Sequence, residues 1–371
     1  ARCNALFALS PTALAVITVV GAVTTLFAAT IALTQTDIKR VVAYSTISQL
    51  AYMFIACGVG AYGAGVFHLF THAFFKALLF LGCGSVILGM HHEQDMRSMG
   101  GLGKHMPVTN ATFLLASLSI AGVPGLAGFF SKDEILLMAF NAGTFTGYLA
   151  WGVGVLVAFM TAFYSFRLYF SVFTGEFRGT HHQREHLHES PLVVTVPLLV
   201  LAVGAVASGW LGIPHVLGGS NHWAEFLAPV TGHPHVHVSA AVELGLMVVS
   251  VAAGAAGIGL AWIMYCRRPE LPGKVASTFA GLYRLFSHKY WVDEIYVACL
   301  VRPALWLADN VLLRVVDTRG IDGVVNGVPR AIGRLSTSLR RLQDGQVAHY
   351  LTWLAGGVTA LLLVLQLGFF S

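Results

Sequence analysis

Charged side chains are scarce in this sequence. Asp, Glu, Lys and Arg make up 11% of its 371 residues, against about 25% in an ordinary soluble protein. The 22 Lys and Arg and the 17 Asp and Glu residues are too few to cover a water-facing surface of this size. Hydrophobic residues account for 56%, and the abundant glycine suits membrane helices that pack closely. The composition excludes a soluble enzyme, a collagen and a disordered chain, and it predicts a membrane protein.

Cysteine is also sparse, and its spacing excludes the usual cysteine sites. The five residues lie far apart and none forms a C-x-x-C pair: Cys3, Cys57, Cys83, Cys266 and Cys299. This pattern suggests neither a disulfide framework nor a zinc or iron–sulfur site. The net charge of +5 is concentrated in loops between apolar segments, which indicates membrane topology and not a nucleic-acid-binding surface. We therefore expect no nucleic-acid partner and no metal or redox cofactor held by this chain.

Eight segments are apolar enough to cross a bilayer, which takes about 20 residues. They are Pro11–Leu33, Val41–Val59, Gly63–Gly89, Pro107–Phe140, Tyr148–Phe173, Pro191–Leu211, Ser239–Tyr265 and His349–Phe370. The fourth is too long for one straight span and contains Gly122, Pro124 and Gly125, so we expect a broken helix there. The predicted fold is all-α, a polytopic transmembrane helix bundle of about eight spans with one of them broken.

Basic residues alternate from loop to loop along the chain. Loops 34–40, 90–106 and 174–190 carry two Lys or Arg residues each and 266–290 carries five, whereas 60–62, 141–147 and 212–238 carry none. Loops rich in Lys and Arg stay on the cytoplasmic side of a membrane. The first set of loops is therefore predicted to be cytoplasmic.

The pattern changes near the C-terminus, where polar and apolar residues alternate with helical spacing. We expect a transmembrane bundle over 1–265, a cytoplasmic connection over 266–291, a long lateral amphipathic helix over 292–345 and a C-terminal anchor span over 346–371. An apolar stripe recurs at steps of three and four residues: Val325, Val328, Ile332, Leu335, Leu339 and Leu342. Breaks or kinks are expected at Gly320, Gly323, Gly327 and Pro329. The stripe suits either a solvated surface helix or a strut against neighbouring subunits, and its length favours the strut.

Three titratable residues share one face of the third span. His68, His72 and Lys76 are spaced four apart, so each is rotated by only about 40° from the one before. Lys76 lies at mid-depth, where an ionisable group costs about 2.5 kcal/mol or more. Histidines that only bond across a helix interface are the structural alternative. Three such groups on one face favour a proton-conducting row, because a lysine in hydrocarbon can release its proton as nearby charges change.

The broken fourth span carries a second set of charges, Lys132, Asp133 and Glu134. A broken helix survives in a membrane only where its freed backbone groups face protein or water, and transporters place ion sites at such breaks. The position of Lys132, eight residues before Phe140, places it near mid-membrane. The alternative is a charged loop, and the apolar residues that follow argue against it.

Weaker candidates lie closer to the membrane surfaces. Asp37 and Lys39 mark either a site of proton uptake or a plain basic anchor. Arg167 is expected to reach toward the cytoplasmic surface. Two loops are rich in histidine and are interpreted as solvated, with metal binding as the alternative: His181, His182, His186 and His188 in one, and His233, His235 and His237 in the other.

Three motifs occur in the same order and spacing as in a known family. They are Thr34–Arg40 with Ala43–Gln49, then Phe67–Phe80, and Gly128–Leu136. The sequence closely resembles the antiporter-like membrane subunits of respiratory complex I, an NADH-quinone oxidoreductase, and within them the subunit L (chain 5) branch. The Trp291–Tyr296 segment and the last span also resemble that branch's lateral helix and anchor.

The resemblance implies a role for each matching residue. His68, His72 and Lys76 would form the proton-conducting axis, Lys132 would release protons outward beside Asp133, and the Asp37 and Lys39 positions would be polar sites near the cytoplasmic face. NADH, flavin, iron–sulfur clusters and quinone would belong to partner chains of the complex. The lateral helix would run along sister antiporter-like subunits, in a bacterial inner membrane.

Two other functions stay open from the sequence. One is a Mrp-type cation/proton antiporter subunit, which shares the core motifs, and the other is a structural membrane subunit that does not pump. The family also has a first half with its own broken helix, which has no counterpart here, so we expect either a partial sequence or a truncated chain.

Overall fold

The computed structural model describes residues 1–232 and 237–368. It divides into two compact units, Ala1–Tyr290 and Trp291–Ser371, and each is described by itself. Within the described residues the chain is helical and forms no β-strand beyond two isolated bridges. The predicted all-α class is therefore confirmed.

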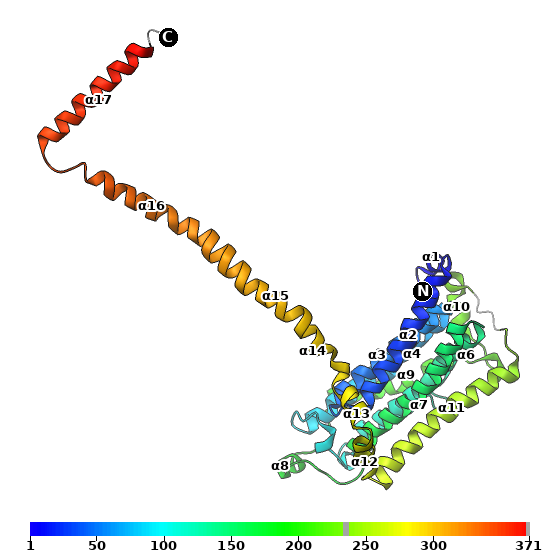
Figure 1. The fold of residues 1–371 in the computed structure, drawn as a ribbon. Helices are drawn as coiled ribbons and strands as arrows, with labels where there is room; N and C mark the ends of the chain where they lie inside the picture. The colour runs from blue at the N-terminus through cyan, green and yellow to red at the C-terminus, as the bar shows by residue number, and fades with distance from the viewer. Residues whose placement is uncertain (233–236, 369–371) are drawn as a thin grey trace. The chain divides into compact units, whose positions relative to one another are not determined.

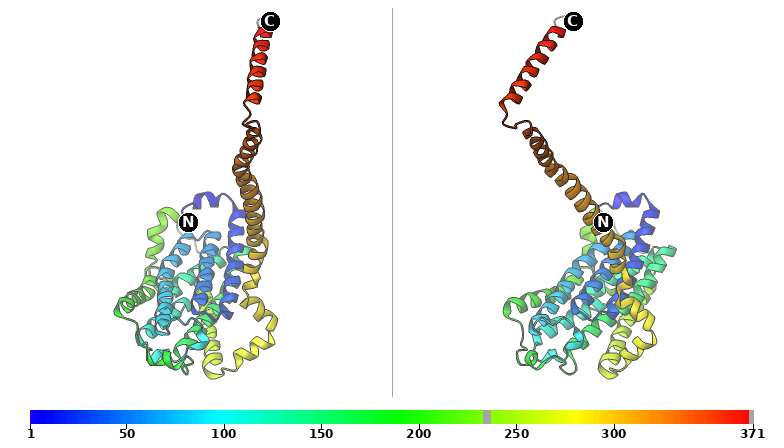
Figure 2. Two further views of the ribbon diagram at one scale, coloured as in Figure 1. Left: turned by 90° about the vertical axis from the view of Figure 1, so that its left-hand side faces the viewer. Right: turned by 60° about the vertical axis from the view of Figure 1, so that its left-hand side comes forward.

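The first unit is a bundle of helices that run side by side (Figures 1 and 2). Its long members are α2 (Pro11–Thr34), α3 (Ile38–Gly58), α4 (Tyr62–Gly89), α5 (Pro107–Ala121), α6 (Ala127–Asn141), α7 (Phe145–Phe173), α9 (Leu192–Ala207) and α11 (Ala240–Trp262). Shorter helices join or flank them: α1 (Asn4–Ala8), α8 (His181–Glu185), α10 (His222–Thr231), α12 (Leu271–Thr278) and α13 (Ala280–Ser287). Helices α3 and α6 each contact both α4 and α7, and these four helices carry many of the buried polar residues.

The expected spans agree with these helices to within a few residues. Eight helices of the described chain are long and apolar enough to cross a membrane, and seven of them coincide with predicted spans. The remaining predicted span is the pair α5 and α6, which the structure separates at residues 122–126. The eighth candidate is Lys289–Arg340, which the sequence pattern assigns to a lateral helix. The chain is thus a multi-pass membrane protein with one broken span.

Close helix contact in the bundle depends on small residues. A Cβ at Gly257 in α11 would lie 2.4 Å from the carbonyl oxygen of Phe159 in α7. Hydroxyl groups also form hydrogen bonds between neighbouring helices. For example, Thr25 Oγ1 in α2 donates to the carbonyl oxygen of Ser48 in α3 at 2.8 Å. Helices in a bilayer associate through such packing and hydrogen bonds, since lipid is as apolar as leucine.

The basic loops lie together at one end of the bundle, which we call the basic end. Gln35 Nε2 in loop 34–40 donates to the carbonyl oxygen of Ser287 in loop 266–290 at 3.3 Å. The backbone N–H of Ile38 donates to Gln94, and that of Gly101 donates to Thr174. The loops that lack Lys and Arg meet at the other end, where Trp223 Nε1 donates to the carbonyl oxygen of Gly63 at 3.2 Å. The structure therefore groups the loops as the charge pattern predicts.

The second unit contains a long helical segment followed by α17. The segment is built from α14 (Val292–Tyr296), α15 (Arg302–Trp306) and α16 (Asp322–Arg340), joined by stretches of i→i+5 helical turns at Val297–Val301 and Leu307–Ile321. It is helical throughout, so a break at Gly320, Gly323, Gly327 or Pro329 is wrong, and a kink there stays a prediction. Pro329 lies inside α16. Turns with i→i+5 hydrogen bonds occur inside α-helices as bulges, and the helix continues on both sides of them.

Helix α17 (Val347–Gly368) corresponds to the expected last span, whose predicted end at Phe370 lies outside the described residues. Within the described part of this unit, the apolar stripe of the long segment is exposed along its length. A stripe of this kind fits a surface that packs against another chain or lipid.

Candidate functional site

The break between α5 and α6 creates a binding site for an ammonium group. Helix α5 ends because Gly122 adopts a left-handed conformation with φ of 82°, which glycine takes readily. The carbonyl oxygens of the last turn then lack helical partners. Lys132 Nζ donates to two of them, Ala121 at 3.1 Å and Ile120 at 3.4 Å. The negative end of the α5 dipole thus faces a buried lysine, which is worth roughly 0.3–2 kcal/mol.

A close contact between α5 and α6 holds this break in place. The backbone N–H of Gly128 donates to Ser119 Oγ at 3.2 Å. A Cβ at Gly128 would lie 2.0 Å from the carbonyl oxygen of Ser119. Only glycine allows the two half-helices to approach this closely.

Lys76 begins a chain of direct polar contacts through the centre of the bundle. Its Nζ donates to Ser45 Oγ in α3 at 2.8 Å, and Tyr164 in α7 donates its hydroxyl to the same oxygen at 2.8 Å. Tyr164 also contacts Thr161 Oγ1 at 3.3 Å, to which Gln49 Nε2 donates at 3.5 Å. All five residues are buried.

The chain continues from Gln49 through a histidine to α6. His68 Nε2 and Gln49 Oε1 lie 3.1 Å apart, and His68 Nδ1 lies 2.9 Å from Ser131 Oγ. Because a carbonyl oxygen only accepts, His68 donates from Nε2, and in the neutral ring Nδ1 accepts from the Ser131 hydroxyl. Thr71 Oγ1 contacts the same serine at 2.7 Å. We call the residues Lys76, Ser45, Tyr164, Thr161, Gln49, His68 and Ser131 the central polar chain.

His72 lies beside the central polar chain and outside its hydrogen bonds. Its ring centroid is 6.1 Å from that of His68. Its Nε2 is buried and, among the described residues, has no hydrogen-bond partner. The structure therefore brings all three residues of the predicted row together on α4, but it joins Lys76 to His68 through α3 and α7.

The three consecutive charged residues of α6 reach three different surroundings. Lys132 meets the end of α5, whereas Asp133 Oδ1 accepts from Ser250 of α11 at 2.6 Å. Glu134 Oε1 accepts from Asn221 at 3.3 Å, and its Oε2 is buried without a partner among the described residues. Two cavities of about 310 and 500 Å³ meet at Glu134 on the end opposite the basic end. The second is also lined by Glu225 and Glu243.

Asp37 at the basic end serves as a helix cap. Its Oδ1 accepts from the backbone N–H groups of Lys39 and Arg40 at 2.8 and 3.1 Å, which satisfies two donors of the first turn of α3. Its other oxygen lies 3.7 Å from Arg40 Nε. A role in proton uptake for Asp37 and Lys39 stays a prediction.

Arg167 does not reach the surface as expected. The side chain is buried, and Nη1 donates to the carbonyl oxygen of Ala32 at 3.4 Å. The last carbonyl groups of α2 attract a cation, and this attraction replaces contact with water.

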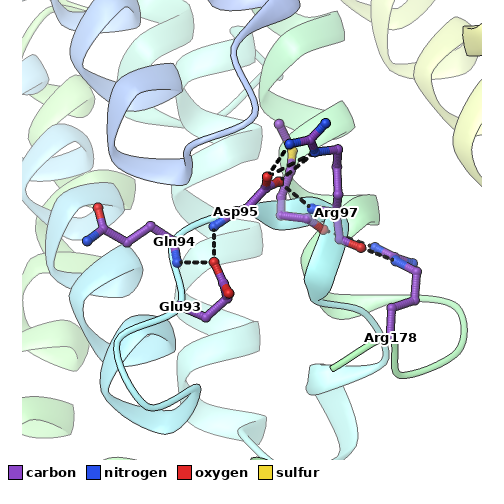
Figure 3. A network of polar contacts seen from close by, with 6 residues as sticks. Glu93, Gln94, Asp95, Arg97 and Arg178 are labelled. Carbon is purple, nitrogen blue, oxygen red and sulfur yellow. Dashed lines mark hydrogen bonds and ion pairs between the residues drawn. The ribbon is translucent and has the colours of Figure 1, made fainter. Parts of the chain in front are cut away.

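Hydrogen bonds and an ion pair join several loop residues at the basic end (Figure 3). Arg97 donates to both carboxylate oxygens of Asp95, with Nη2 at 2.5 Å from Oδ2. Arg178, from the loop after α7, donates to the carbonyl oxygens of Arg97 and Met96 at 3.0 and 3.1 Å. The network thus ties the loop after α4 to the loop after α7.

We expect this network to weaken in acid. The Arg97 guanidinium holds the pKa of Asp95 below its usual value, so the contribution of Asp95 to stability is full above about pH 4. It is lost as the pH falls through the lowered pKa of the folded state. Hydrogen-exchange protection factors of the 93–98 backbone should therefore drop in acid. Asp95→Asn should lower them already at neutral pH, and Glu176→Gln, an exposed loop change, should not. Equal protection in Asp95→Asn and the parent would contradict the prediction.

Several residues of this site are not among those that the sequence analysis identifies as candidates. Ser45 and Gln49 lie four residues apart in α3, and Thr161 and Tyr164 three apart in α7, so a search for polar pairs on one helix face would have found them. Glu134 was in the recognised motif without a role. The histidine loops are exposed as expected at His181, His182, His186 and His188. His233 and His235 lie outside the described residues.

Comparison with known proteins finds a family model and several relatives that match this chain. Residues 1–161 match the family model described as "NADH:quinone oxidoreductase/Mrp antiporter, TM". NADH-quinone oxidoreductase subunit L of Neisseria meningitidis is 41% identical over 97% of this chain. Over most of its length the chain is thus similar to membrane subunits of NADH-quinone oxidoreductase. NADH-ubiquinone oxidoreductase chain 5 of Marchantia polymorpha is 38% identical over 99% of it.

The relatives are longer than this chain. It covers 57% of the Neisseria subunit L and 56% of the Marchantia chain 5. A solved structure of the Mrp complex from Dietzia sp. DQ12-45-1b is also similar, with 25% identity, a TM-score of 0.50, and coverage of 82% of this chain and 33% of that one. The subunit L resemblance inferred from the three motifs is confirmed, and the Mrp likeness fits the shared motifs.

Proposed function

We propose that this chain is part of a proton-translocating membrane subunit of an NADH-quinone oxidoreductase of a bacterial inner membrane. The observation that carries the proposal is the central polar chain, which joins Lys76 to Ser131 by direct contacts between buried side chains. Hydroxyl groups, an amide and an imidazole provide a path along which protons can move. Electron transfer in partner subunits, which hold the flavin, iron–sulfur clusters and quinone, supplies the energy.

In the proposed route, protons pass from Lys76 toward Lys132 and leave near Glu134. Ser131, the end of the central polar chain, precedes Lys132 on α6, and Asp133 follows it as a nearby counter-charge. Glu134 connects this part of α6 with the two cavities at the far end. Water can bridge the gaps where buried polar groups converge. His72 Nε2, which has no partner among the described residues, is one such group.

The basic end would face the cytoplasm, where Asp37 and Lys39 are the candidates for proton uptake. Sister antiporter-like subunits would cover the apolar stripe of the long helical segment in the second unit. A strut of this kind links subunits that must act together.

Lys76→Met tests the proposal, with Lys104→Met as the matched control. Lys76 is buried in the central polar chain, whereas Lys104 is exposed in a loop. In inside-out membrane vesicles that contain the full-length protein in its complex, Lys76→Met should lower NADH-driven proton uptake per electron. Electron transfer with an uncoupler should remain, and Lys104→Met should match the parent. Unchanged proton uptake per electron in Lys76→Met would contradict the proposal and favour a structural membrane subunit that does not pump.

A second candidate function is cation/proton antiport, which the likeness to the Mrp complex supports. The higher identity to subunit L favours the first candidate. Purification of the full-length protein from its native membrane separates the two. Partners that oxidise NADH and contain flavin indicate the oxidoreductase, and their absence with sodium-dependent proton movement indicates the antiporter.

A further inference from the structure

Three histidines from two separate loops meet at the basic end of the bundle. His91 lies in the turn after α4, and His182 and His186 lie four residues apart at α8. One ring nitrogen from each falls within 4.8 Å of the others. Within the described residues, this is the one group of three or more His, Cys, Asp or Glu side chains placed to hold a metal ion.

The surrounding hydrogen bonds orient this cluster. His186 Nδ1 lies 3.1 Å from the carbonyl oxygen of His182, so Nδ1 carries the proton and Nε2 is left as a lone-pair donor. A backbone carbonyl in this position orients metal-binding histidines in many proteins. Gln183 Nε2 donates to the carbonyl oxygen of Met90 at 3.1 Å. That bond holds α8 against the turn that carries His91.

We infer that His91, His182 and His186 form a binding site for a divalent transition metal, with Zn²⁺ as the best fit. Zinc takes three imidazoles and one water in a tetrahedral arrangement, with Zn–N bonds of about 2.0 Å and ligand nitrogens about 3.3 Å apart. The three ring nitrogens lie within 4.8 Å of one another, and rotation of the exposed side chains can bring them to this spacing. Imidazole ligands exclude Mg²⁺ and Ca²⁺, which prefer oxygen.

The site goes beyond proton translocation and does not depend on it. A bound ion would join the turn after α4, where His91 lies, to the α8 connection between α7 and α9. Helix α4 also carries Lys76. The ion would thereby add a further link between two loops that hydrogen bonds of Arg178 and Gln183 already join.

Zinc titration of the full-length protein tests the site. The protein is purified in detergent without a polyhistidine tag, stripped of metal with a chelator, and titrated with ZnCl₂ against a fluorescent zinc indicator. We expect one more bound Zn²⁺ per chain than in the triple variant His91→Gln, His182→Gln, His186→Gln. Each single variant should weaken this site at least about tenfold.

His181→Gln is the control, because His181 shares α8 but lies 3.3 Å from Glu185 and outside the cluster. It should leave zinc affinity unchanged. Zn²⁺ should also slow hydrogen exchange at 181–186 in the parent and not in the triple variant. Equal zinc binding by the parent and the triple variant would overturn the site. If His181→Gln and His182→Gln weaken zinc binding equally, the assignment of His182 as a zinc ligand is wrong.

Discussion

Lys132→Met is expected to reduce NADH-driven proton translocation roughly tenfold or more in vesicles that contain the full-length complex. Lys132 is the buried cation at the break in the fourth span, and its Nζ binds the open carbonyl groups of α5. Methionine preserves most of the side-chain volume and removes the amine to which the proposed route assigns proton transfer. The measurement is NADH-driven uptake by inside-out vesicles, followed with a pH-sensitive dye and divided by the electron-transfer rate.

Two controls separate a lost proton carrier from a lost structure. Lys274→Met changes an exposed lysine in α12 and should retain full translocation. Native gel electrophoresis should show the same amount of assembled complex for both variants. If Lys132→Met assembles normally and translocates at the parental proton-to-electron ratio, Lys132 does not carry protons.

Gly128→Ala is expected to destabilise the protein by roughly 3 kcal/mol or more. The added Cβ would lie 2.0 Å from the carbonyl oxygen of Ser119 and 2.8 Å from its carbonyl carbon. Backbone atoms cannot move aside as a flexible side chain can, so α5 and α6 would have to separate. The measurement is thermal unfolding of the purified full-length protein in detergent.

Gly152→Ala provides the matched control for this change. Gly152 lies inside α7, and a Cβ there meets nothing within 4 Å. Alanine should be neutral or raise stability by up to about 1 kcal/mol, because it favours the helix. Gly128→Ala with the same unfolding temperature as Gly152→Ala would contradict the close packing of the break.

The spans and their break were predictable because both depend on local sequence. A run of about 20 apolar residues defines a span regardless of its neighbours, and the sequence places Pro124 between two glycines at the break. The loop charges predicted which loops share one end, and backbone contacts such as Ile38 with Gln94 confirm that grouping. The breaks expected in the long lateral segment were wrong, because isolated glycines lower helix stability without ending a helix.

The site was only partly predictable from sequence. His68, His72 and Lys76 were placed on one face by helical spacing, and they lie there as buried residues of α4. Their hydrogen-bond partners could not be predicted from the sequence. Ser45 is 31 residues from Lys76, and Tyr164 is 119 residues from Ser45, so these residues meet only when the helices pack. Arg167 was misplaced for the same reason, because the α2 carbonyl group that it binds is 135 residues away.

The sequence by itself determined that this chain is a multi-pass membrane protein with a broken span and buried lysines. Apolar run length, glycine and proline positions and loop charge act locally, so no partner is needed to interpret them. Only the tertiary structure decided that Lys76 reaches His68 through α3 and α7, that Lys132 caps α5, and that His91 meets His182 and His186. Each of these contacts joins residues that are close only when the helices pack, and hydrogen bonds and metal sites depend on distances of a few ångströms.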